Sequence, residues 1–246
     1  MSYVYMKALE SAPERYDRGM RLLTLGRLDR VYTDIADKFA PGDRVLDVGC
    51  GTGKLVAKLA AKGCVATGID IAAPMLGQAG ERVRELGVES RVTLRDLGAV
   101  DLDTAFADKS FDGVVSTLVF SELSRDEITY TLGECWRILQ PGGQLLIADE
   151  VLPDSHLGRV AVLLFRLPFV ILTFLLTQNT THRVAGLGDR IEDAGFEVVD
   201  TQRYLAGTLQ LLAAVKPRRQ PGKSESCPRP DSDGRSIGHD GGHQAC

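Results

Sequence analysis

A glycine-rich loop at residues 47–53, with the sequence Asp-Val-Gly-Cys-Gly-Thr-Gly, constrains the fold of this chain more than any other feature. The apolar run at 44–48 predicts a short buried strand, and the pattern at 54–62 predicts a helix that ends at Gly63. Glycines between a strand and a helix permit positive φ and let a ligand approach the backbone closely. The loop therefore predicts an α/β fold with a ligand site after this strand.

Strand-like and helix-like segments continue to alternate along the chain. We expect strands at 65–69, 91–94, 112–116 and 144–149, a turn at 141–143, and helices at 14–39 (one or two), 74–86 and 126–139. This alternation is typical of a parallel sheet with helices on both faces. Two last strand-like runs, 196–203 and 208–215, are too close in sequence for a parallel crossover. The sequence therefore predicts a mostly parallel sheet with one reversed strand at its end.

The length of 246 residues suits one α/β domain with added segments. We divide it into an N-terminal helical segment at 1–40, a main domain at 41–216 and a tail at 217–246. The tail is mostly polar residues, glycine and proline, so we expect it to be disordered, and we expect no metal site at its residues His239, His243 and Cys246.

Charge and cysteine usage exclude several classes of protein. The formal net charge of -4 gives no case for nucleic-acid binding, which normally needs a basic face. None of the five cysteines forms a CxxC pair, and the N-terminus has no charged segment followed by an apolar run. We therefore expect a cytoplasmic protein without disulfides.

The residues around the loop indicate which ligand it binds. The spacing is GxGxG, whereas dinucleotide-binding loops have GxGxxG to place a pyrophosphate on a helix N-terminus. Asp47, just before the glycines, would repel a pyrophosphate but suits the amino group of an amino acid. Asp70, at the end of the next predicted strand, suits both hydroxyls of a ribose. These features predict a nucleoside with an amino-acid end and no phosphate, which is S-adenosylmethionine.

Three stretches of the chain resemble class I S-adenosylmethionine-dependent methyltransferases: 45–53, 69–76 and 139–145. The resemblance implies a Rossmann-like sheet of seven strands, mostly parallel, with the last strand antiparallel. It also implies that Gly49, Gly51 and Gly53 pass under the methionine moiety, with Cys50 as a common residue of that loop, and that Asp70 binds the ribose. The remaining implied contacts are to adenine from Ile71, Asp96 and Leu97, and to the methionine end from Ser116.

Methyl transfer from a sulfonium depends mainly on alignment, so an acid-base pair is not required. Catalytic candidates are Glu122 and Asp149, with Glu150 and His182 as further possible bases. Each has a structural alternative: Glu122 as a helix cap, Asp149 and Glu150 as acceptors for loop amides, and His182 as a surface residue.

An apolar run at 157–177 lies within an insertion at about 152–185, after the fifth strand. Arg159, Arg166 and Pro168 interrupt it, and a membrane span would separate the last strands from their sheet. We expect an apolar cap over a small-molecule acceptor. Peripheral membrane contact or a partner-docking face through 157–177 stays open.

A narrower resemblance, to the corrinoid protein-associated methyltransferases, rests on 1–19, 120–123 and 148–151. It implies a corrinoid protein as a partner and a corrinoid-linked acceptor. By analogy with quinone-type methyltransferases, Tyr16 and Asp17 would close over the cofactor. The alternatives are a non-catalytic S-adenosylmethionine-binding partner of a corrinoid protein and an NAD-dependent oxidoreductase.

Overall fold

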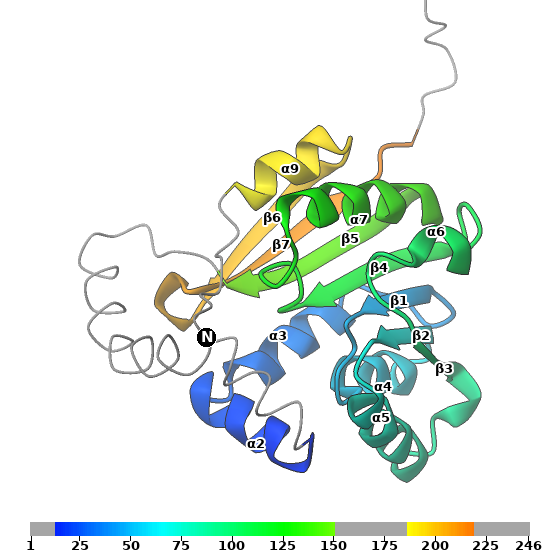
Figure 1. Ribbon diagram of the computed structural model, residues 1–246, viewed down its shortest axis with the longest axis vertical. Coiled ribbons are helices and arrows are strands. Elements are labelled where there is room, and N and C mark those ends of the chain that lie inside the picture. Colours follow the sequence, from blue (N-terminus) through cyan, green and yellow to red (C-terminus); the bar gives the residue numbers. More distant parts are fainter. Residues whose placement is uncertain (1–12, 151–185, 219–246) are drawn as a thin grey trace, which may run out of the picture.

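The strand that precedes the glycine loop, β1 (Arg44–Val48), lies in the interior of a seven-stranded sheet (Figure 1). The computed structural model describes residues 13–150 and 186–218, and in this part of the chain the strand order is β3-β2-β1-β4-β5-β7-β6. The other strands are β2 (Val65–Asp70), β3 (Val92–Asp96), β4 (Phe111–Thr117), β5 (Leu139–Glu150), β6 (Glu197–Tyr204) and β7 (Leu209–Val215).

Strand β7 is antiparallel to both of its neighbours, β5 and β6. The pairs β1–β2, β1–β4, β2–β3 and β4–β5 are parallel. The predicted mostly parallel, Rossmann-like sheet with a reversed last strand is therefore confirmed.

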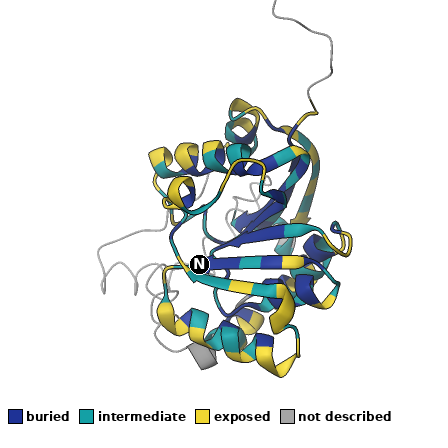
Figure 2. Ribbon diagram, turned by 90° about the vertical axis from the view of Figure 1, so that its right-hand side faces the viewer, coloured by how far each residue is buried: buried dark blue, intermediate teal, exposed yellow. Residues whose placement is uncertain are grey.

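Successive side chains of a strand point to opposite faces of the sheet, and this alternation creates two hydrophobic cores. Val45 packs into one core and Leu46 into the other. Helices cover both faces as predicted, and in Figure 2 the central strands are dark blue while the outer helix surfaces are yellow. Helices α2 (Pro13–Leu23), α3 (Arg27–Ala36), α4 (Lys54–Ala61) and α5 (Ala73–Glu85) contribute to the first core, and α6 (Leu102–Ala105), α7 (Arg125–Ile138) and α9 (Leu187–Asp193) to the second.

Two local expectations are sharpened by the structure. The helical pattern at 14–39 forms two helices, because Leu25 and Gly26 have φ values of 50° and 73° and interrupt the turn between α2 and α3. The predicted turn at 141–143 is an irregularity within β5, where Gly142 has φ 85° and its amide donates to the Lys216 carbonyl. Four short elements were not predicted: α6, α9 and the 3-10 turns Glu89–Arg91 and Leu205–Gly207.

Several expectations fall outside the described residues. They are the cap at 152–185 with its apolar run 157–177, the candidate base His182, the first part of the segment 1–40, and nearly all of the tail 217–246. Within the ranges 13–150 and 186–218, no helix is long and apolar enough to cross a membrane.

Candidate functional site

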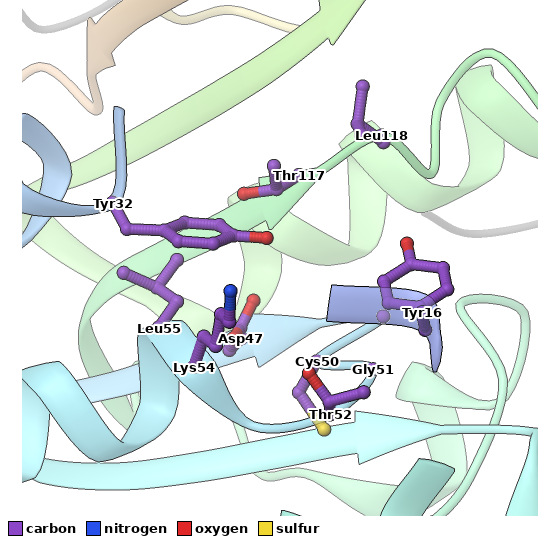
Figure 3. Close-up of a pocket in the computed structure, with 11 residues that line it drawn as sticks. Tyr16, Tyr32, Asp47, Cys50, Gly51, Thr52, Lys54, Leu55, Thr117 and Leu118 are labelled. Carbon is purple, nitrogen blue, oxygen red and sulfur yellow. The ribbon is translucent and has the colours of Figure 1, made fainter. Parts of the chain in front are cut away.

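A pocket of about 360 Å³, partly open to solvent, lies where β1 and β4 end (Figure 3). These strands are neighbours, and the chain continues to β2 on the other side of β1. Ligands of open α/β sheets bind at such a point, outside the carboxyl ends of the strands. The pocket is lined by Tyr16, Tyr32, Asp47, Gly49, Cys50, Gly51, Thr52, Lys54, Leu55, Thr117 and Leu118.

The glycine loop between β1 and α4 forms one wall of this pocket. Gly49, Gly51 and Gly53 have φ values of 74°, 52° and 74°, a conformation that favours glycine. A Cβ on Gly49 would lie 2.1 Å from Val119, and one on Gly53 would lie 2.7 Å from Ala79. A Cβ on Gly51 would meet nothing within 4 Å. The first and third glycines therefore permit close packing, whereas Gly51 leaves open space above the loop.

Asp70, at the end of β2, is bound to the loop and to the start of α5. Its Oδ2 accepts from the Gly51 amide at 2.8 Å, and its Oδ1 accepts from the Ala72 amide at 2.8 Å. A carboxylate oxygen has two lone pairs and can accept from more than one donor. The ribose role of Asp70 stays a prediction, and the carboxylate lies beside the loop, as that role requires.

Asp47, the last residue but one of β1, is 2% exposed and lines the pocket. No described residue donates a hydrogen bond to its carboxylate. Burial, together with the nearby charge of Asp70, raises the pKa of Asp47 to about 8. A cationic ligand group would remove this penalty, because an opposite charge favours the ionised carboxylate.

The residues expected at adenine lie beside Asp70, outside the pocket lining. Asp96 is the register partner of Asp70 in β3, and the Leu97 amide donates to the Asp70 carbonyl at 3.2 Å. Ile71 is 69% exposed, which is unusual for an isoleucine next to a buried strand. The structure therefore brings Ile71, Asp96 and Leu97 to one edge of the sheet, where an apolar surface is open.

Ser116 and Cys50 are directed into the protein. The Ser116 hydroxyl is buried and donates to the Val48 carbonyl at 2.9 Å. Cys50 is 8% exposed, and burial raises the pKa of its thiol, so it remains uncharged. Its sulfur packs over Gly68, where an added Cβ would lie 2.9 Å away. Ser116 thus joins β4 to β1, and its neighbour Thr117 lines the pocket.

Five lining residues were not identified from the sequence: Tyr32, Lys54, Leu55, Thr117 and Leu118. Thr117 and Leu118 directly follow the predicted strand at 112–116, so extending that prediction by two residues would have included both. Leu118 has φ 62°, a backbone conformation that is rare for leucine and common near functional sites. Tyr32 is part of a helical pattern and carried no separate signal.

The N-terminal helix α2 reaches the glycine loop. Asp17 accepts a hydrogen bond from the Thr52 hydroxyl at 2.8 Å and pairs with Arg82 of α5. Its carboxylate also lies 3.7 Å from the Lys54 ammonium. Tyr16, the preceding residue, lines the pocket. These contacts are compatible with the expected closure of Tyr16 and Asp17 over the cofactor, a role that stays a prediction.

The two catalytic candidates have different surroundings. Asp149 is 1% exposed, and its oxygens accept from the amides of Ser121 at 3.0 Å and Glu150 at 2.7 Å. Burial raises the pKa of Asp149 to about 6, and these hydrogen bonds oppose the shift. Glu122 is exposed on the loop after β4. It does not cap α7, because Ser124 and Glu127 form the capping box there.

The chain is similar to known methyltransferases. A family model described as a methyltransferase domain matches residues 45–143. The chain is 33% identical over 211 residues to a demethylmenaquinone methyltransferase of Lactiplantibacillus plantarum, covering 78% of this chain and 87% of that protein. It is 28% identical over 239 residues to a protein of the same name from Symbiobacterium thermophilum, covering 87% and 93%.

The fold is also found among solved structures. The magnesium protoporphyrin IX methyltransferase of Synechocystis, crystallised with S-adenosylmethionine, matches with a TM-score of 0.58 at 19% identity. The match covers 80% of this chain and 81% of that structure. At this identity the similarity concerns the fold alone.

Proposed function

Because this chain belongs to the class I S-adenosylmethionine-dependent methyltransferases, we propose that it methylates an apolar small molecule of the quinone type. The observation that carries this acceptor class is the alignment with demethylmenaquinone methyltransferases over most of their length. The apolar run at 157–177 agrees with an apolar acceptor. Membership of the family establishes the enzyme class and the cofactor, and the quinone-type acceptor is what we propose.

The residues of the pocket fit S-adenosylmethionine. When bound, the cofactor supplies a methyl group on a sulfonium for in-line displacement. The open space above Gly51 admits a ligand next to the loop backbone. The buried Asp47 carboxylate, without a hydrogen-bond donor among the described residues, suits a positively charged amino-acid end. The chain's own contribution is to hold and orient the cofactor, which is the main requirement for this reaction.

Methylation of a ring carbon releases a proton, so a quinone-type acceptor would benefit from a nearby base. Both oxygens of Asp149 are bound to the amides of Ser121 and Glu150, and this supports a positioning role for the loop after β4. Glu122 lies on that loop and is exposed. We assign Glu122 as the candidate base and Asp149 as the residue that positions its loop.

The proposal is tested by incubating the purified protein with S-adenosylmethionine and a short-chain demethylmenaquinol. We expect S-adenosylhomocysteine and the ring-methylated product in equal amounts by mass spectrometry. Gly51→Arg should abolish turnover by filling the ligand space, whereas Gly87→Arg, at an exposed glycine of similar φ (65°) with nothing within 4 Å, should retain it. Cofactor binding without turnover of any quinol would contradict the acceptor assignment.

The corrinoid-linked acceptor is the second candidate, favoured by the sequence resemblance at 1–19, 120–123 and 148–151. A parallel assay replaces the quinol with reduced cobalamin, free or bound to a corrinoid protein. Methylcobalamin formation in the absence of quinol methylation would favour this candidate. Cofactor binding with neither product would favour the non-catalytic partner.

A further inference from the structure

The outer side of helix α2 combines exposed arginines with exposed leucines. Its inner side carries Met20, which is 2% exposed, and Tyr16, which lines the pocket. The outer side chains recur every three or four residues, so they form one stripe, which continues beyond the helix end at Leu23. Figure 1 shows α2 at the periphery of the molecule, away from the sheet. We call this stripe the α2 surface, and its residues are Arg18, Arg21, Leu22 and Leu25.

The two leucines of the α2 surface are largely exposed to solvent. Leu22 is 75% exposed and Leu25 is 76% exposed. Leu25 also has φ 50°, a left-handed conformation that helices usually give to a glycine at this position. The Gly26 amide closes the turn by donating to the Arg21 carbonyl at 2.7 Å. A strained leucine in solvent gains no burial within the described fold, which indicates an apolar contact outside it.

Positive charge surrounds these leucines. The exposed arginines between residues 16 and 30 are Arg18, Arg21, Arg27 and Arg30. Arg30 lies 3.9 Å from Asp34, and the other three make no ion pair with a described residue. Asp17 and Asp29, the acids of the same stretch, are paired with basic residues of α5 and α4. The formal net charge of the chain is -4, so this excess of positive charge is local.

We propose that the α2 surface docks the protein on an anionic lipid bilayer. A bilayer provides both required partners at one interface: phosphate groups for the guanidinium groups and, directly beneath them, an apolar layer for the leucines. Anionic headgroups also attract basic segments electrostatically. An acidic protein groove would satisfy the charge, but a bilayer also receives two leucines that project from a helix end and needs no preformed pocket for them.

The α2 surface and the pocket lie on opposite sides of one helix, because Tyr16 on the inner side lines the pocket. A quinone-type acceptor with an apolar tail dissolves in a bilayer, so docking would bring the enzyme to its acceptor. This benefit rests on the proposed function, whereas lipid binding by the α2 surface does not.

Vesicle co-sedimentation of the full chain tests lipid binding. We expect the protein to bind vesicles that contain phosphatidylglycerol, to bind pure phosphatidylcholine much more weakly, and to dissociate at high salt, which screens exposed charges. Arg18→Gln with Arg21→Gln should weaken binding roughly ten- to thirtyfold. Leu22→Ser with Leu25→Gly should weaken it about tenfold. Leu25→Gly alone should not lower the melting temperature, because glycine adopts this φ without strain.

Matched controls come from α5, which carries an exposed arginine and ends at an exposed leucine. Arg84→Gln and Leu86→Ser should leave vesicle binding unchanged, and losses equal to those of the α2 variants would overturn the proposal. Absent binding to any vesicle would also overturn it. Binding that survives both double variants would assign lipid contact to another part of the chain. A dimer in sedimentation velocity that Leu22→Ser dissociates would assign the α2 surface to a second copy. These measurements need no acceptor, so their failure is distinguishable from a failure of quinol methylation.

Discussion

At the scale of single residues, we expect the charge state of Asp47 to change when the ligand binds. This residue is buried, faces the charge of Asp70 and the phenol of Tyr32, and has a pKa raised to about 8 in the free protein. At pH 7 its carboxyl is therefore mostly protonated before the cofactor binds. An ammonium beside it favours the ionised form.

We therefore expect the binding of S-adenosylhomocysteine at pH 7 to release a proton, with affinity rising from about pH 6 to about pH 8. Calorimetry in phosphate and in Tris, which differ in ionisation enthalpy, measures this proton. Asp47→Asn should remove the buffer dependence and serves as the control for titration of the ligand's own amine. Identical binding enthalpies in the two buffers for the native protein would contradict the prediction.

At the scale of secondary-structure elements, contacts between elements determine which side chains serve the pocket. Asp17 joins α2 to the glycine loop through Thr52 and to α5 through Arg82. Both charged partners are largely buried, with exposures of 18% and 21%, so solvent screens this pair less than a surface pair. The N-terminal helix is therefore coupled to the order of the cofactor loop.

Asp17→Asn should weaken S-adenosylhomocysteine binding about three- to tenfold, because the loop loses its charged contact with α2. Hydrogen exchange of the α2 amides should become faster in the same variant. Asp37→Asn removes an exposed ion pair with Lys62, at 60% exposure of the carboxylate, and should change neither measurement. Unaltered exchange in α2 would mean that Asp17 does not tie this helix to the loop.

At the scale of the whole molecule, the side chain of Lys216 links three elements at one end of the sheet. It follows β7, is 8% exposed, and its ammonium donates to the carbonyls of Trp136 at 2.5 Å and Leu139 at 2.7 Å. These carbonyls belong to the end of α7 and the start of β5. One side chain therefore connects the reversed strand, a helix end and a central strand.

Lys216→Met should lower the free energy of unfolding by about 1–3 kcal/mol, because two buried carbonyls lose their donor. Urea denaturation followed by circular dichroism measures the change. Lys109→Met, at an exposed lysine, is the matched control and should have little effect. An unfolding free energy equal to that of the native protein would show that water replaces the ammonium without cost.

Much of the architecture followed from local sequence patterns. Strand and helix periods predicted the order of the main elements, and the short connection before β7 predicted its reversed direction. The irregular short helix α6 has no such period and was not predicted. Patterns of this kind report which face of an element is buried, so they locate elements better than they locate the contacts between them.

The sequence by itself determined the ligand class, because the glycines at 49, 51 and 53 and the flanking Asp47 act through the local backbone of one strand, loop and helix. The tertiary structure decided which distant residues complete the site. Tyr32 and Thr117 reach the pocket only because α3 packs against α4 and β4 pairs with β1. A helical period or a strand pattern cannot distinguish a side chain that fills a core from one that lines a pocket, because both are buried by the same packing.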